Sequence, residues 1–172
     1  MTKLPTWVMI AGGIVALVAI QKAFQMTPVV DSAKWPKSFN DRKRNNAKIV
    51  EKAIRDAGFD DRVVKAALAN AWRESGMNEA AVGDGGKAIG LFQIHPWGGS
   101  VEYRANPANN VALMLQKEAL ANTWFGRKFR EVAKTGTAED IAEAWCRYLE
   151  RPANKDAESA KSRALVRQFW GA

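Results

Sequence analysis

The chain has 172 residues, of which 47% are hydrophobic and 26% are charged, a size that suits one globular domain with an appendage and leaves little room for two full domains. Its formal net charge of +8 favours anionic partners such as nucleic acid, a membrane surface or a cell-wall polymer. A single cysteine, Cys146, excludes an intrachain disulfide, and with His95 as the lone histidine we expect neither a metal site of the His/Cys type nor a cofactor.

The positive charge is concentrated near the N-terminus. Residues 1–46 carry seven lysines and arginines against two aspartates, whereas the remaining residues carry 19 basic and 16 acidic side chains. The basic residues are also not interleaved with aromatic residues on one element, as they are in many nucleic-acid-binding proteins. We therefore expect no nucleic-acid partner for the folded part.

An uncharged run at residues 4–21 opens the chain and is flanked by Lys3 and Lys22. As a helix it would extend roughly 27 Å, close to the bilayer core of about 30 Å. This pattern predicts a single transmembrane helix over 1–24, with a cleaved signal peptide and a buried core helix as alternatives. Six basic residues follow the run and one precedes it, so the positive-inside rule would leave the C-terminal part in the cytoplasm, and the orientation stays open.

Residues 25–37 contain two prolines and no helical period, which predicts an extended linker. From residue 38 to residue 172 the apolar residues recur with helical spacing between capping residues, which predicts one mainly helical domain. The predicted helices run from Ser38 to Gly58, from Asp60 or Asp61 to Gly76, from Pro107 towards Trp124, over 127–134, from Thr137 to Pro152 and from Ala157 to Trp170.

Between the second and third of these helices, residues 77–105 hold six glycines and no long period. Such a segment suits turns and short strands, since glycine adopts backbone conformations that other residues avoid. We therefore expect a mainly α domain with one small glycine-rich β excursion, which begins directly after Glu74.

Glu74 lies at the edge of an apolar stripe with Ala67 and Ala71, in the last turn of its predicted helix. Partial burial and the negative helix C-terminus both disfavour the carboxylate, so both raise its pKa. A carboxylic acid that stays protonated near neutral pH can donate the proton that a leaving sugar oxygen needs. A solvated glutamate is the alternative for this position taken alone.

Two further polar residues lie in the glycine-rich segment. Asp84 is positioned to face Glu74 if the excursion folds back over the helix end, where one carboxylate would act as acid and the other as base; the alternative is an ordinary turn aspartate. Gln93 ends an apolar run and needs a partner there, either a sugar acetamido group or a structural hydrogen bond.

The stretch ESGMNEAAVGDGGKAIGLFQIHP, residues 74–96, resembles the signature of the lysozyme-like superfamily, which includes goose-type lysozymes, soluble lytic transglycosylases and phage tail-associated lysozymes. The resemblance covers about residues 45–170 and implies a lysozyme-like α+β domain. It implies that Glu74 is the catalytic acid, that Ser75 supports it and that Gln93 lines the sugar cleft. The stretch AEAWCRYLERP resembles a later helix of such domains, which implies that Tyr148 hydrogen-bonds Glu74 or the substrate.

Some residues depart from the superfamily pattern. The Ala-Tyr-Asn-Ala-Gly motif of lytic transglycosylases is absent after Tyr148, and His95 stands near a position where goose-type lysozymes have an aspartate. Asp84 matches the Gly-Asp of the goose-type pattern, which favours attack by water. Trp97 and Tyr103 are candidates for stacking on sugar faces, with loop packing as the alternative.

The sequence therefore predicts a membrane-anchored, phage-encoded muramidase, either virion-associated or a lysis enzyme, that cleaves the β-1,4 bond between N-acetylmuramic acid and N-acetylglucosamine. A lytic transglycosylase that forms 1,6-anhydro products and an inactive structural or assembly membrane protein with the same fold are the alternatives. The expected partners are peptidoglycan glycan strands, a lipid bilayer and other virion or cell-envelope proteins. The catalytic domain is expected in the periplasm or in a virion.

Overall fold

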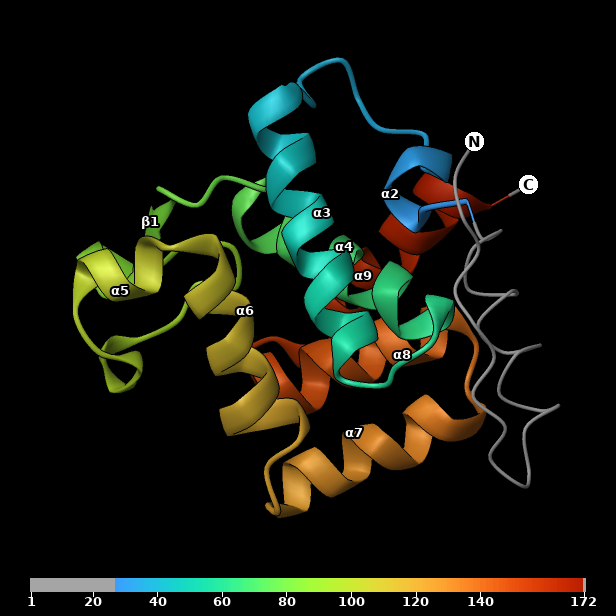
Figure 1. Ribbon diagram of the computed structural model, residues 1–172. Helices are drawn as coiled ribbons and strands as arrows, with labels where there is room; N and C mark the ends of the chain where they lie inside the picture. Colours follow the sequence, from blue (N-terminus) through green and yellow to red (C-terminus); the bar gives the residue numbers. More distant parts are fainter. Residues whose placement is uncertain (1–26, 172) are drawn as a thin grey trace, which may run out of the picture.

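The computed structural model describes residues 27–171, which form mainly helices around one small hairpin (Figure 1). The elements are α2 (Val29–Ser32), α3 (Asp41–Asp56), α4 (Asp61–Ser75), β1 (Val82–Gly83), η1 (Asp84–Gly86), β2 (Ala88–Ile89), η2 (Pro96–Gly98), α5 (Val101–Ala105), α6 (Pro107–Met114), η3 (Leu115–Ala119), α7 (Trp124–Thr135), α8 (Ala138–Ala144), η4 (Trp145–Glu150) and α9 (Lys155–Trp170). Of the η elements, η1 and η2 are 3₁₀ turns, and η3 and η4 are π-helical.

The fold-class prediction needs one correction, because it included a transmembrane helix. Within residues 27–171, no helix combines the length and the apolar character that crossing a membrane requires. The longest helices, α3 and α9, have 16 residues each and carry many charged side chains, whereas a span needs about 20 mostly apolar residues. The predicted span at residues 1–24 lies outside the described residues.

Helix α4 lies at the centre of the domain and packs against α3, α8 and α9. Its run Ala66–Ala71 is fully buried, and these small side chains let the neighbouring helices approach closely. Asp60 caps its start by accepting from two backbone N–H groups, and Gly76 ends it in the left-handed conformation, as the sequence predicts. This placement fixes Glu74 in the last turn, against the core.

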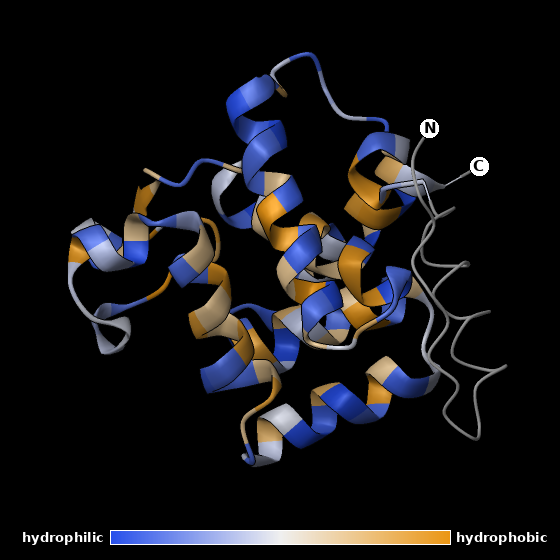
Figure 2. Ribbon diagram, viewed as in Figure 1, coloured by the Kyte–Doolittle hydropathy of each residue, from blue (hydrophilic) through white to orange (hydrophobic). Residues whose placement is uncertain are grey.

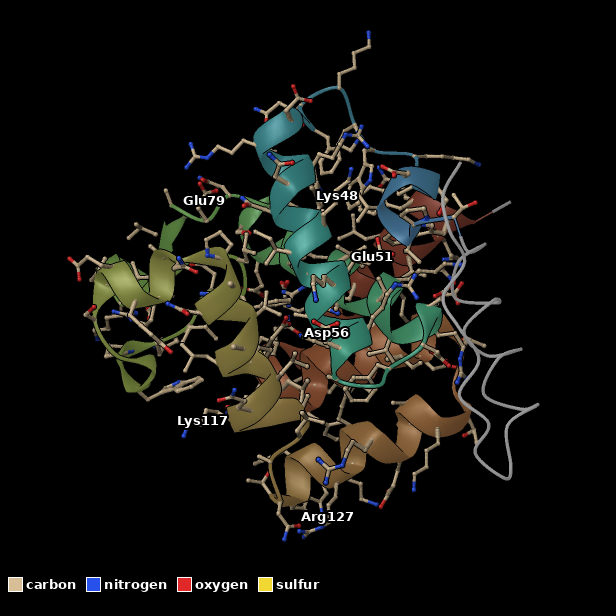
Figure 3. The ribbon with its side chains drawn as sticks, in the orientation of Figure 1. Lys48, Glu51, Asp56, Glu79, Lys117 and Arg127 are labelled. Carbon is tan, nitrogen blue, oxygen red and sulfur yellow. The ribbon has the colours of Figure 1, made fainter. Side chains whose placement is uncertain are left out.

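Part of the predicted linker 25–37 is packed into the domain. Val29 and Val30 of α2 are buried, and their N–H groups each donate to the Glu51 carboxylate at 3.0 Å. Glu51 projects from α3 towards α2 (Figure 3). The indole N–H of Trp170 donates to the Val29 carbonyl at 3.1 Å, so this short helix joins α3 to the C-terminal helix.

The β excursion is present as predicted, directly after Glu74. Strands β1 and β2 pair antiparallel, with Val82 opposite Ile89, and together with α5 they form a lobe that extends from one side of α6 (Figure 1). Phe92 stacks on Trp145 of η4 with ring centroids 5.4 Å apart, which fastens the lobe to the helical body.

The predicted helix from Pro107 towards Trp124 is interrupted. Regular α6 ends at Met114, η3 continues to Ala119, and α7 starts anew at Trp124, where the Thr123 side chain accepts from the Gly126 N–H. Figure 2 shows hydrophilic and hydrophobic residues alternating around α3, α6 and α7, the pattern of helices with one face on a core.

Candidate active site

Glu74 is largely buried at the C-terminal end of α4. Its side chain is 20% exposed, and Oε1 lies 2.6 Å from Nη2 of Arg73. Burial raises the pKa of Glu74, while the positive charge of Arg73 opposes that rise and Glu158 adds to it. The direction agrees with the expectation from sequence, and it keeps this group protonated to higher pH than a solvated glutamate.

Arg73 connects Glu74 to a second carboxylate. The same Nη2 atom forms an ion pair with Glu150 of η4, and Nη1 binds Glu158 of α9 at 2.9 Å. Nε donates to the Ser162 hydroxyl at 3.0 Å, so every nitrogen of the guanidinium has a partner. One buried arginine therefore joins the ends of α4, η4 and α9 and sets the charge around Glu74.

Glu150 is the more buried member of the pair, with 7% of its side chain exposed. Burial raises its pKa to about 8; Arg73 opposes this shift and the negative charge of Glu74 adds to it. Among the described residues, neither Glu150 Oε1 nor the Trp145 indole N–H has a hydrogen-bond partner. A buried carboxylate with a free oxygen is costly, which favours a proton on this pair near neutral pH.

A hollow of about 100 Å³ lies between the β lobe and the helical body, and Glu150 forms part of its wall. One side comes from the segment after β2 and the other from α6, η3, η4 and the residue after η4. Its lining residues are Phe92, Gln93, Ile94, His95, Trp97, Met114, Glu118, Leu149, Glu150 and Arg151. The hollow thus borders the Glu74–Arg73–Glu150 cluster.

Gln93 and Trp97, both predicted to bind substrate, line this hollow. Gln93 adopts φ +47°, and its Nε2 donates to the carbonyls of Ala81 and Gly90 at 3.3 and 2.9 Å. A Cβ at Gly83 would lie 2.3 Å from Gln93 Oε1, so glycine is required there for the amide to pack. Gln93 therefore closes the hairpin with its side chain and also forms part of the lining of the hollow.

Asp84 occupies a different environment from Glu74. It lies on the exposed turn η1, where Oδ2 is 3.8 Å from Nδ1 of His95. Its backbone has φ +47°, and Gly85 follows at +61°, which makes a tight left-handed turn. The carboxylate that shares a partner with Glu74 is Glu150.

Three other predicted site residues lie apart from the hollow's lining. The Ser75 hydroxyl donates back to the Ala71 carbonyl at 2.9 Å, within its own helix. Tyr148 packs edge-on against Trp124, with centroids 5.8 Å apart. Tyr103 is exposed on α5, in the β lobe.

Four residues that organise this region were not predicted from the sequence. Arg73 and Glu150 make the charge cluster, and buried Arg104 and Asn110 hold the excursion. Arg104 Nη1 donates to the carbonyls of Lys87 and Ile94 at 2.6 and 2.7 Å. Asn110 donates to the carbonyls of Ile89 and Arg104 and accepts from the Phe92 N–H, all within 2.9 Å.

A sequence signal existed for the two charged residues of the cluster. Glu150 follows Cys146 by four residues and so continues the apolar stripe of its helix, and Arg73 follows buried Asn70 by three. A charged residue on the buried face of each of two helices indicates a pair of opposite charge, because lone buried charges are too costly.

The family comparison gives one match. A family model described as phage tail lysozyme matches residues 45–170, a range that includes α4, the β lobe and η4. No curated protein and no solved structure matches the chain.

Proposed function

The chain belongs to the phage tail lysozyme family, and from that premise we propose that it is a muramidase that cleaves the β-1,4 bond between N-acetylmuramic acid and N-acetylglucosamine. A lysozyme-like, peptidoglycan-degrading function follows from the family itself. The particular bond and the attacking group are our proposal. The observation that carries it is the burial of Glu74 beside Arg73, which joins it to Glu150; Glu150 lines the hollow, and Glu74 lies one ion pair behind that lining.

In this proposal Glu74 is the general acid. Glu74 and Glu150 titrate together around Arg73, and burial keeps a proton on the pair near neutral pH. A glycan strand in the hollow removes more water from Glu74 and so favours the proton there. Glu74 then donates it to the glycosidic oxygen as the bond breaks and an oxocarbenium-like state develops.

Asp84 is proposed as the base that activates the attacking water. Its carboxylate is 61% exposed on η1, beside His95, where solvent water reaches it. It reaches the reaction through movement of the η1 turn, where a left-handed aspartate precedes Gly85 and Gly86. Ser75, Gln93, Trp97, Tyr103 and Tyr148 remain proposed substrate contacts, of which Gln93 and Trp97 have the support of lining the hollow.

A virion or periplasmic location is consistent with the family. We propose that the protein is phage-encoded and acts either as a virion component that opens a path through the cell wall or as a lysis enzyme. In either case its partner is the glycan strand, and other virion or envelope proteins are proposed neighbours.

The direct test replaces Glu74 by glutamine in the full chain and follows clearing of purified peptidoglycan. The amide keeps the shape of the side chain, but its N–H protons are too weakly acidic to be transferred to the leaving oxygen, so the rate should fall by about 10²-fold to 10⁴-fold. Binding to the insoluble wall should persist. Clearing at the wild-type rate would refute the assignment of Glu74.

One observation favours a lytic transglycosylase as the second candidate. The carboxylate that shares a partner with Glu74 is Glu150, which is buried and has a raised pKa, while Asp84 is exposed beside His95. Attack by the muramic acid 6-hydroxyl does not require a second carboxylate, and the product is then a 1,6-anhydro sugar. A purely structural role is the remaining alternative, and wall binding without clearing by the wild-type chain would favour it.

A further inference from the structure

An exposed aromatic cluster lies at the start of α7, outside the hollow. Trp124 is 53% exposed, Leu120 45% and Phe125 37%. Single exposed apolar residues are ordinary, but a contiguous group with a tryptophan at its centre usually marks a binding surface. We call Trp124, Phe125 and the partly buried Tyr148, whose rings contact one another, the aromatic platform.

The rings of the platform hold one another in place. Trp124 contacts Phe125 edge-to-face with centroids 5.2 Å apart, and it meets Tyr148 in the same manner at 5.8 Å. Tyr148 belongs to η4 and packs against the hydrophobic core. Trp124 is thus oriented by its neighbours before any ligand arrives, while more than half of its surface stays open to solvent.

Arg151 connects the platform to the hollow. Its guanidinium lies 5.0 Å from the centre of the Phe125 ring and also donates to both carboxylate oxygens of Glu118, at 2.6 and 2.9 Å. Arg151 and Glu118 both line the hollow. The platform therefore begins at the rim of the hollow. Figure 3 labels Arg127, in the same first turns of α7, at the edge of the molecule.

The size of the hollow indicates what the platform binds. A volume of about 100 Å³ is small beside the roughly 300–1,000 Å³ of ordinary ligand pockets, so it admits only a short part of a polymer. A glycan strand that is bound in the hollow therefore continues over the protein surface beside it. Each pyranose ring has a face of C–H groups that packs well on an indole, and its hydroxyl groups remain in water.

We propose that the aromatic platform is a sugar-binding subsite, in which Trp124 stacks on a pyranose ring of the same glycan strand that enters the hollow. We assign a sugar ring of this glycan strand to the platform for two reasons. Arg151 joins the platform to the lining of the hollow, and Trp124 is held by its neighbours while more than half of it stays exposed. This inference rests on the proposed function, since it assigns an additional subsite to the same substrate.

The test measures binding in the full chain with Glu74→Gln as the non-cleaving parent. Adding Trp124→Ala should weaken sedimentation with purified peptidoglycan by about threefold to tenfold, the range expected when one aromatic contact is lost. Trp124→Tyr, which keeps a ring, should restore most of the binding. Adding Val101→Ala to the parent, an exposed residue of α5, is the matched control and should bind as the parent does.

Activity separates failure of the subsite from failure of the proposed function. With active Glu74, Trp124→Ala should raise KM for long glycan strands and leave unchanged the cleavage of an oligosaccharide that is too short to reach the platform. Binding equal to the parent's would overturn the subsite even if the wild-type chain clears peptidoglycan. A change from dimer to monomer on Trp124→Ala in sedimentation velocity would also overturn it, because the platform would then contact a second copy. If the wild-type chain cleaves nothing, the proposed function fails. The binding measurement on the Glu74→Gln variants then still shows whether Trp124 contacts the glycan.

Discussion

At Arg73, a single guanidinium faces three carboxylates, from Glu74, Glu150 and Glu158. Three negative charges around one positive charge in a mostly buried place favour retention of a proton, and burial directs that proton towards Glu74 and Glu150. The raised pKa that glycosidic cleavage requires of Glu74 therefore depends on Arg73, Glu150 and Glu158 together.

Replacing Glu150 by glutamine should change the pH dependence of activity. Glu74 acts as the protonated form, so activity is lost as pH rises through its pKa. Glu74 and Glu150 share one nitrogen of Arg73, so glutamine at position 150 leaves that nitrogen to the Glu74 carboxylate, and the pKa of Glu74 falls. The alkaline limb of the rate profile should shift to lower pH.

Peptidoglycan clearing measured from pH 4 to pH 10 tests that shift. Glu143→Gln is the matched control, because Glu143 of α8 pairs with Arg147 of η4 and Arg163 of α9 and forms no ion pair with Arg73. The groups that also face Glu150 are Glu74, Arg73, Cys146 and the Trp145 indole, and the variant leaves all four intact. An alkaline limb identical to that of the wild-type chain would contradict the proposed coupling.

The same residue should affect stability in a pH-dependent way. Folding raises the pKa of Glu150 to about 8, so the folded state binds this proton more tightly than the unfolded state does. Its contribution to stability is fully present below the unfolded pKa and is lost as pH rises through about 8. The Tm of the wild-type chain should therefore fall more between pH 6 and pH 9 than that of Glu150→Gln. Parallel Tm curves for the two proteins would show that Glu150 does not titrate in this range.

At the residue scale, the sequence predicted the acid but not its neighbours. The position of Glu74 on its helix was sufficient to predict a raised pKa, because burial and the helix end depend on local spacing. The pairing of Arg73 with Glu150 depends on which helices pack together, and residues 77 apart in the chain meet only in the folded domain. Whether Asp84 faces Glu74 depends on how the loop after α4 folds in space, and residue spacing along the chain does not predict that.

Among the elements, the β lobe depends on two buried polar side chains. Arg104 and Asn110 bind four backbone groups of the segment from Lys87 to Ile94, which has almost no sheet of its own. At Gly90, a Cβ would lie 2.5 Å from the Asn110 amide nitrogen, so this contact also requires glycine. The lobe that carries Gln93 and Trp97 is thus held by side chains more than by strand pairing.

Asn110→Ala should loosen that lobe. Loss of three buried hydrogen bonds leaves the Arg104 carbonyl and the Phe92 N–H unpaired, at a cost of about 1–3 kcal/mol for each group that water cannot reach, while the Ile89 carbonyl still accepts from the Ile94 N–H. The free energy of unfolding by urea should fall, and KM for peptidoglycan should rise. Asn109→Ala, a substitution one residue earlier on α6, is the control and should change neither quantity much. Equal stability of the two variants would contradict this role.

Element boundaries followed the sequence where capping residues were clear, at Asp60, Gly76 and Thr137. They departed from it where a helix changes its hydrogen-bonding pattern. Neither π-helical segment, η3 or η4, has a local sequence signal, and both border the hollow. Likewise α2 is ordered by the distant Glu51 carboxylate, which the two prolines near it did not indicate.

For the whole molecule, the mainly helical domain and its single β excursion were predictable, since helical period and glycine density are readable along the chain. The transmembrane helix was predicted from an uncharged run at residues 4–21, outside the described part of the chain, and no helix within residues 27–171 could span a membrane. Figure 2 shows helices such as α3 and α7 with hydrophilic residues on one face and hydrophobic residues on the other. The family match over residues 45–170 covers the whole candidate site and agrees with the resemblance seen in residues 74–96.

The measurement that tests the central claim most directly is mass spectrometry of the products released from purified peptidoglycan by the full-length wild-type chain and by Glu74→Gln. Hydrolysis by water should give fragments that end in reducing N-acetylmuramic acid, each one water heavier than the 1,6-anhydro form, and Glu74→Gln should release almost none. The same reducing fragments from Glu74→Gln at the wild-type rate, or cleavage at a bond other than the β-1,4 bond after N-acetylmuramic acid, would contradict the account.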